Sequence, residues 1–274
     1  MLFFHTWVEG FSLGVFVSQN FKLKMMIKPK VVLFLFFSFF ISEKSIAQDQ
    51  FKLLVYTIHD DWHSNSIPVA IEAFQKLAKK HQFKFDWTQR PNELIKKLPN
   101  YDVVVFVNAN ADSLKENHIE GLKKFMKRGG GFVGVHSTSA GKIRKPWFDN
   151  LIGGVFVDHP KLQAAIVKVE DKNFPAVFHL PQKMLWSDEW YNFKNININK
   201  LNVVLSVDET SYDFTAGYDK IPLKGMGKLH PVAWSHTYQG GRVFYTSLGH
   251  KPEVFKDEIY MKHLLGGIYW VLKK

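Results

Sequence analysis

The sequence predicts an α/β fold built on a mostly parallel sheet, and two observations lead to this prediction. Between residues 51 and 136, apolar β-rich segments alternate with amphipathic helical segments, which is typical of parallel strands joined by right-handed helical crossovers. The composition is 46% hydrophobic and 22% charged over 274 residues, so the chain can bury a large core.

The first unit is a strand followed by a helix. Residues 51–58, FKLLVYTI, are almost continuously apolar, as expected for a strand that is covered on both faces. Apolar residues then recur at helical spacing from Ile67 to Ala78, and Ser66 with Pro68 marks the helix start. The next elements expected are a strand, a short helix and a strand at residues 83–88, 91–98 and 101–108.

The fourth strand is expected to end on a histidine. Ser113 followed three residues later by Glu116 matches a capping box, which predicts the start of a helix. That helix ends at Gly129, and the segment GGFVGVH then forms a strand that runs to His136.

The second half is less regular. Its β-rich segments predict strands at residues 162–170, 184–191, 202–209, 230–238 and 241–248. The sequence YQGGR at 238–242 predicts a hairpin turn, and helical spacing of apolar residues predicts a last helix over about 253–272. We expect residues 48–274 to form one domain, in which 142–230 is an elaboration beside the sheet.

The amino-terminal segment predicts export. Residues 31–41, VVLFLFFSFFI, are too few to span a bilayer as a helix, and they follow Lys28 and Lys30, which is the layout of a secretory signal peptide. Ser45 and Ala47 are small residues of the kind that signal peptidase recognises. We therefore expect cleavage after Ala47 and a mature chain that is periplasmic or secreted and has no membrane span.

Residues 1–47 are thus interpreted as a signal peptide with an additional N-terminal extension. A signal peptide normally begins with its basic region close to the initiator methionine, which favours Met25 or Met26 as the true start. The alternative is that the first 24 residues are a genuine extension.

Charge and cysteine content exclude several classes of function. The net charge is +11, and it falls to +8 without residues 1–47, which hold five Lys and two Glu. The remaining basic residues are scattered over helical segments and form no basic-aromatic stripe, so we expect no nucleic-acid partner. The absence of cysteine excludes disulfides, thiolate metal sites and cysteine nucleophiles.

Polar side chains follow the predicted parallel strands at the edge where ligands gather in an open sheet. His59 comes after the first strand, Asn108 after the third, and His136 with Ser137 after the fourth. We expect these residues to lie along one edge.

Five segments occur in an order shared with a known family: GGGFVGVHSTSAG (129–141), IGGVFVDHP (152–160), DEWY (188–191), DETSY (208–212) and HPVAWSHTYQGGRVFYTSLGH (230–250). Together they resemble the ThuA-like family, which is associated with the utilisation of trehalose and related sugars. The resemblance implies a class I glutamine amidotransferase-like, flavodoxin-like three-layer sandwich. In the amidotransferases a cysteine occupies the turn after this strand. Here that position resembles His136, so glutaminase activity is not expected.

Three residues are the candidates for proton transfer. A strand-to-helix turn exposes His136 beside backbone N–H groups, and His250 also follows a strand, at 241–248. Asp188 and Glu189 face opposite sides of a strand, and we prefer Glu189 as the acid or base. For His136, the alternative is a structural hydrogen bond to a neighbouring loop.

Further candidates for substrate binding are His159, Trp190, Tyr191, Trp234 and His236. Pro160 restricts His159 to extended conformations, so a fixed loop presents its ring. An aromatic ring beside a carboxylate is a common sugar-binding arrangement, and the alternative is that these rings belong to the core.

A divalent metal is a further alternative. His136, His159, His236, His250 and Glu189 are suitable ligand types for zinc or a similar ion, although their spacings form no compact signature.

We therefore expect a protein of carbohydrate utilisation that processes a glycoside or keto-sugar of the trehalose type by acid/base chemistry, as a hydrolase, lyase or isomerase. The alternatives are a non-catalytic sugar-binding protein, in which Trp186, Trp190, Tyr212 and Trp234 stack on sugar rings, and a metal-dependent hydrolase. The oligomeric state does not follow from the sequence.

Overall fold

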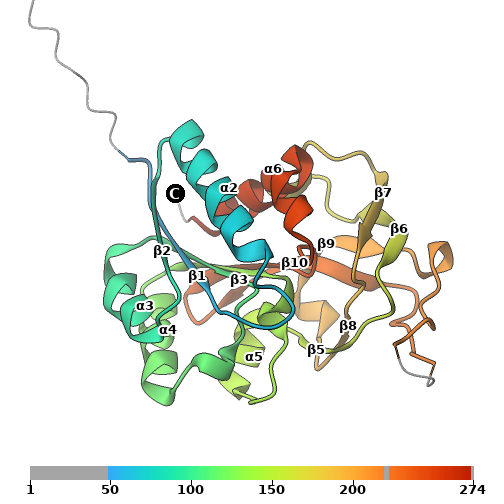
Figure 1. The fold of residues 1–274 in the computed structure, drawn as a ribbon, viewed down its shortest axis with the longest axis horizontal. Coiled ribbons are helices and arrows are strands. Elements are labelled where there is room, and N and C mark those ends of the chain that lie inside the picture. The colour runs from blue at the N-terminus through green and yellow to red at the C-terminus, as the bar shows by residue number, and fades with distance from the viewer. Residues whose placement is uncertain (1–48, 219–221, 273–274) are drawn as a thin grey trace, which may run out of the picture. The chain divides into compact units, whose positions relative to one another are not determined.

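A mixed sheet forms the centre of the molecule in the computed structural model, which describes residues 49–218 and 222–272 (Figure 1). Across the sheet the strands are β2 (Lys84–Thr88), β1 (Lys52–Thr57), β3 (Val103–Val107), β4 (Gly131–Val135), β11 (Gly241–Thr246), β10 (His230–Tyr238), β9 (Asn202–Val207), β6 (Gln163–Val169) and β7 (Lys183–Asp188). Two further strands, β5 (Val155–Asp158) and β8 (Asn192–Lys194), form a separate antiparallel pair.

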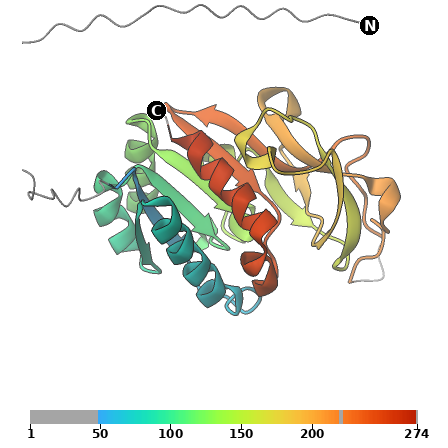
Figure 2. The same cartoon turned by 90° about the horizontal axis from the view of Figure 1, so that it is seen from above.

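Helices cover both faces of the sheet, as Figures 1 and 2 show. One face carries α2 (Ser66–His81) and α6 (Glu258–Val271), and the other carries α3 (Pro91–Lys97), α4 (Glu116–Lys127) and α5 (Pro146–Ile152). In β1, Leu53 and Val55 pack in the core on the α2 side, whereas Leu54 and Tyr56 pack in the core on the α3 side. The α/β prediction is confirmed, because both faces of these strands are apolar and buried.

The direction of each strand decides which residues share an edge. β2, β1, β3, β4 and β11 run parallel to one another, so their carboxyl ends lie at the same edge. The predicted hairpin turn joins β10 to β11, and the two strands are antiparallel. Within the turn, Gln239 and Gly240 have positive φ angles of 47° and 96°. The carboxyl end of β10 therefore lies at the opposite edge from the carboxyl end of β11.

Two details differ from the sequence-based expectations. The segment 142–230 contributes β6, β7 and β9 to the main sheet as its far half, rather than lying beside it. The helix expected after Ser113 begins at Glu116, because Ser113 lies in a short 3-10 turn and its hydroxyl contacts the Tyr56 hydroxyl at 2.8 Å.

The predicted signal peptide and its cleavage site lie outside the described residues. Among the helices of the described part of the chain, none has the length and apolar character needed to cross a bilayer.

Candidate functional site

His136 marks the centre of the candidate site, directly after β4. Its φ angle is 51°, an uncommon conformation for a residue with a side chain, and its side chain is fully buried. The Tyr245 hydroxyl donates to the His136 carbonyl at 2.8 Å and so holds the turn. Backbone strain of this kind is frequent at functional sites.

One hydrogen bond fixes the tautomer of His136. Its Nδ1 lies 2.6 Å from the Ser247 carbonyl oxygen, which only accepts, so Nδ1 carries the proton. In the neutral ring, Nε2 is then an acceptor, and the Tyr191 hydroxyl donates to it at 2.7 Å. Burial, and then the charge of Glu189, raises the pKa of Tyr191, so this hydroxyl stays protonated at neutral pH.

Glu189 lies among three imidazoles. Its Oε2 is 3.4 Å from His136 Nε2, 3.3 Å from His250 Nδ1 and 3.6 Å from His159 Nε2. Burial acts to raise the pKa of Glu189, but the three neighbouring histidines lower it overall, so the group is a carboxylate at neutral pH. The structure thus brings together His136, His159, Glu189, Tyr191 and His250.

Asp188 positions Glu189 and His250 through hydrogen bonds to their backbone N–H groups. It is buried and accepts hydrogen bonds from the backbone N–H groups of Glu189 at 2.9 Å, Gly249 at 2.9 Å and His250 at 3.3 Å. Gly249 has a φ angle of 126°, and a Cβ there would lie 2.5 Å from the Tyr260 hydroxyl, so the turn requires glycine. Burial raises the pKa of Asp188, against the effect of His136 and the three N–H donors.

His250 is the more accessible of the proton-transfer candidates. Its side chain is 22% exposed, against 7% for Glu189 and 0% for His136. Burial lowers the pKa of His250 to about 4, although the nearby Glu189 opposes this shift, so the ring is neutral at pH 7. Its Nδ1 is buried and makes no hydrogen bond to the described residues, because the contact with Glu189 lacks hydrogen-bond geometry.

His63 belongs to the same group and was not expected from the sequence. It lies in the loop between β1 and α2, and its Nδ1 is 2.8 Å from Asp60 Oδ2. Its ring centroid is 5.0 Å from that of His136 and 5.4 Å from that of His250. One ring nitrogen from each of His63, His136 and His250 lies within 4.8 Å of the others, so these three residues could hold a metal ion. The spacing of Asp60 and His63 by three residues was the signal available in the sequence.

Asn108 and Ser137 lie beside His136, at the ends of neighbouring strands. The Asn108 N–H donates to the Val135 carbonyl at 3.3 Å, and its Nδ2 donates to Ser66 Oγ at 2.9 Å. Asn108 Oδ1 and Ser137 Oγ are buried and have no hydrogen-bond partner among the described residues. An unpaired buried polar atom is costly, and both of these atoms belong to residues next to His136 at the carboxyl edge of the sheet.

Four of the predicted substrate-binding residues have side chains outside this group: Trp190, Trp234, His236 and His59. Trp190 and Trp234 are fully buried, and their indole N–H groups donate to the carbonyls of Gln163 and Ile152, so neither ring has a face for a sugar. His236 pairs with Val243, which pairs with Phe132 near the start of β4. His236 therefore lies toward the opposite edge of the sheet from His136.

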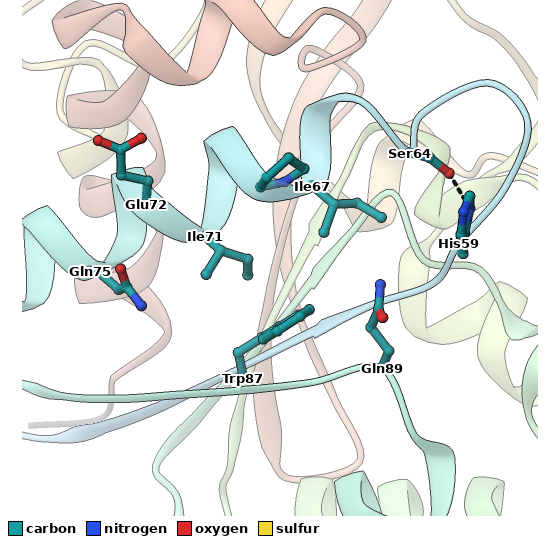
Figure 3. A pocket seen from close by; sticks show the side chains of 9 residues that line it. His59, Ser64, Ile67, Ile71, Glu72, Gln75, Trp87 and Gln89 are labelled. Atoms are coloured by element: carbon teal, nitrogen blue, oxygen red, sulfur yellow. Dashed lines mark hydrogen bonds between the residues drawn. The ribbon is translucent and has the colours of Figure 1, made fainter.

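His59 lines a separate open groove beside α2, which Figure 3 shows. The groove has a volume of about 410 Å³ and places His59 and Ser64 at one end and Glu72 and Gln75 at the other. Trp87, which is 38% exposed, forms part of its apolar wall. His59 Nδ1 is hydrogen-bonded to the Ser64 hydroxyl.

Comparisons with known proteins support the fold. The model of a family described as "ThuA: Trehalose utilisation" matches residues 52–271. A ThuA-like protein from Bacteroides uniformis ATCC 8492 has a similar structure, with a TM-score of 0.72 and 24% identity over 83% of this chain and 94% of that one. A ThuA-like protein from Parabacteroides merdae ATCC 43184 has a TM-score of 0.63 and 17% identity, over 81% and 90% of the two chains. A search of curated sequences finds no match.

Proposed function

This chain belongs to the ThuA family of trehalose utilisation, and from that premise we propose that it processes a glycoside or keto-sugar of the trehalose type by acid/base chemistry. The observation that carries the proposal is the position of Glu189, whose Oε2 lies 3.3–3.6 Å from nitrogen atoms of His136, His159 and His250. Proton transfer requires a general acid and a general base with different pKa values in one site that the substrate can reach.

The residues divide into a base and a proton donor. Glu189 is the base, because its lowered pKa keeps it ionised at neutral pH. Tyr191 is the proton donor, because its hydroxyl is protonated at neutral pH and lies in the centre of the site, on His136 Nε2. His136 holds that hydroxyl in place through Nε2, while the Ser247 carbonyl fixes the ring. His250 is neutral and exposed enough to contact the sugar.

The arrangement supports removal of a proton from a sugar hydroxyl or from a carbon next to a ketone. Glu189 accepts that proton, and Tyr191 supplies one to the oxygen that gains negative charge. Asn108 Oδ1 and Ser137 Oγ are available for hydrogen bonds to the remaining hydroxyl groups of the sugar.

The test compares turnover of trehalose, its 3-keto derivative and related glycosides by the wild-type protein and by Glu189→Gln. This substitution keeps the shape of the side chain and removes the base, so we expect kcat to fall by about 10²–10⁴-fold. Glu170→Gln is the matched control, because Glu170 is an exposed carboxylate beside Ser206. Equal turnover by both variants would refute the assignment of Glu189 as the base.

Binding without turnover would instead identify a sugar-binding protein. Isothermal titration of the same sugars into the wild-type protein measures this directly. This alternative requires exposed aromatic rings that stack on the sugar. Two of the four rings expected to do so, Trp190 and Trp234, are fully buried.

We also propose that the protein is exported and that residues 48–274 form the mature domain. The support is the apolar segment 31–41 with its flanking lysines and the small residues Ser45 and Ala47. Mass spectrometry of the secreted or periplasmic protein should give a chain that begins at Gln48. A chain retained in the cytoplasm with residues 31–41 intact would contradict the proposal.

A further inference from the structure

The distances around Glu189 are unusual for hydrogen bonds. A charge-assisted N–H···O bond measures about 2.7–2.9 Å. The separations of Glu189 Oε2 from His136 Nε2 and His250 Nδ1 are 3.4 and 3.3 Å. Two ligands of a tetrahedral zinc ion, each about 2.1 Å from the metal, lie about 3.4 Å apart. These separations are too long for direct charge-assisted hydrogen bonds and match those between atoms arranged around one ion, which puts Glu189 at the edge of an open coordination position.

The imidazole rings show the same spacing. The three ring centroids of His63, His136 and His250 are 5.0, 5.3 and 5.4 Å apart. When three histidines bind one zinc ion tetrahedrally, the same bond length places their ring centroids about 5.2 Å apart. The ligand nitrogens already lie within 4.8 Å of one another, so small rotations of the rings bring them to bonding distance.

Hydrogen bonds on the outer side of two rings direct the lone pair of the inner nitrogen toward the centre of the group, where His136 Nε2 accepts from the Tyr191 hydroxyl. Nδ1 of His63 donates to Asp60 Oδ2, and Nδ1 of His136 donates to the Ser247 carbonyl. A carboxylate or carbonyl on one nitrogen fixes the tautomer of a metal-binding histidine and directs the lone pair of the other nitrogen inward. Asp60 is itself fixed, because it accepts from the backbone N–H of Trp62 at 2.9 Å and of His63 at 2.5 Å.

We propose that His63, His136 and His250 bind a divalent transition-metal ion, with Glu189 beside the open coordination position. Three neutral imidazoles and no thiolate suit zinc or a neighbouring transition metal, whereas magnesium and calcium prefer oxygen ligands. The open position faces the accessible side of the site, because the side chains of His250 and His159 are 22% and 19% exposed.

The inference deepens the proposed function and rests on the same site. A metal ion in this position would polarise a sugar carbonyl or lower the pKa of a bound water. Glu189 would then accept the proton of that water or of the sugar. The Tyr191 hydroxyl, which donates to His136 Nε2, would move from this nitrogen on metal binding and be free to donate to the sugar.

Metal binding is measured without any sugar. The purified protein is stripped with a chelator and then titrated calorimetrically with Zn²⁺, Co²⁺ and Mg²⁺. We expect one equivalent of Zn²⁺ or Co²⁺ to bind with micromolar or tighter affinity and Mg²⁺ to bind far more weakly. The Co²⁺ complex should show the visible absorption bands of a four- or five-coordinate ion with nitrogen ligands. Absence of saturable Zn²⁺ and Co²⁺ binding below millimolar concentration would overturn the inference.

Two substitutions locate the ion. His63→Gln and His250→Gln should each weaken Co²⁺ binding by more than about 100-fold, because each removes a ligand. His236→Gln is the control, since His236 is a partly buried histidine toward the other edge of the sheet. Circular dichroism of the metal-free variants shows whether they are folded. Binding that is unchanged in both folded ligand variants would place the ion elsewhere and refute the site.

A third substitution keeps all three ligands. Asp60→Asn removes the carboxylate behind His63 and should weaken Co²⁺ binding by about 10–100-fold, whereas the exposed neighbour Asp61→Asn should not. Metal binding without sugar turnover would refute the proposed function alone. Sugar turnover at full rate by protein shown to be metal-free would refute the role of the metal in the reaction and leave the proposed function standing.

Discussion

The histidines at the carboxyl edge of the sheet and the buried histidine under α6 differ in what surrounds their ring nitrogens. At the carboxyl edge of the sheet, His63, His136 and His159 each direct one nitrogen to an acceptor, while their rings lie close around Glu189 and His250. In the core under α6, both nitrogens of His263 are paired, with the Ala176 carbonyl at 3.0 Å and the Thr246 hydroxyl at 3.3 Å. Burial alone therefore does not identify a site. The convergence of ring nitrogens does.

The largest expected effect separates the two groups. His250→Gln should reduce kcat/KM for the sugar substrate by about 10²–10⁴-fold and leave the free energy of unfolding nearly unchanged, because His250 is partly exposed. His263→Gln should leave kcat/KM nearly unchanged and lower the free energy of unfolding by about 2–3 kcal/mol, because it disturbs two buried hydrogen bonds. Steady-state kinetics and urea unfolding of both variants test the contrast. The same loss of activity in both variants would show that the two histidines do not differ in function.

The second prediction concerns pH. Burial lowers the pKa of His263 from 6.5 to about 4, with the Ala176 carbonyl opposing the shift and His179 adding to it. Between these pH values the unfolded chain binds a proton that the native protein does not, so stability falls as the pH falls. Between pH 7 and pH 5 this residue should remove about 2 kcal/mol from the free energy of unfolding.

Urea unfolding at pH 7 and pH 5 measures this loss, and His263→Gln should show a smaller one. Comparison of the two proteins cancels the contribution of other groups, His236 included, whose pKa burial also lowers to about 4. An identical pH dependence in both proteins would mean that His263 is not the group responsible.

A smaller effect is expected at Asp188. The Asp188 carboxylate accepts hydrogen bonds from three backbone N–H groups. In Asp188→Asn the new amide NH₂ is a donor, so it cannot accept from the backbone N–H group that it faces. The free energy of unfolding should fall by about 1–2 kcal/mol, and kcat should fall by about 10-fold, because Glu189 and the turn at Gly249 both shift. Unfolding curves and kinetics on one preparation check both numbers. Loss of stability without any loss of activity would show that Asp188 does not position the site.

The smallest effect is expected at His159, which lies at the outer side of the group. Its Nε2 is 3.6 Å from Glu189, and its Nδ1 is held by the Pro160 carbonyl at 2.9 Å. His159→Gln should raise the pKa of Glu189, because it removes a neighbour that lowers it. The acidic limb of the kcat/KM profile should move to higher pH by less than about one unit. A shift to lower pH would show that His159 does not lower the pKa of Glu189.

Much of the fold was predictable because its first half follows simple periodicity. Buried parallel strands such as β1 and β3 are continuous apolar runs, and helices such as α2 have one apolar stripe. Strand alternation predicted that only one of Asp188 and Glu189 faces the site, and the structure places Glu189 among the imidazoles with Asp188 turned toward Gly249. The start of α4 was misplaced because Ser113 makes a long-range contact with Tyr56 instead of capping the helix.

The site was predictable only in part, because strand direction is a property of the whole sheet. His236 follows the polar pattern of a strand end as well as His250 does, but β10 is antiparallel to β11 and carries His236 away from His136. Trp190 and Trp234 are buried by sheet partners that local sequence does not reveal. His63 lies in a loop without periodicity, and only folding brings it to His136.

The hydrogen bond between His136 and Ser247 also has a consequence for the order of folding. It joins positions 111 residues apart, and the Asp188 bonds to Gly249 and His250 join positions 61 and 62 residues apart. Contacts of such long sequence separation form late, after the intervening strands have paired. A chain that is still emerging, or one that is clipped before β11, has Glu189 and His136 but lacks the turn that orients them. We therefore expect no turnover of the proposed substrates before β11 has docked.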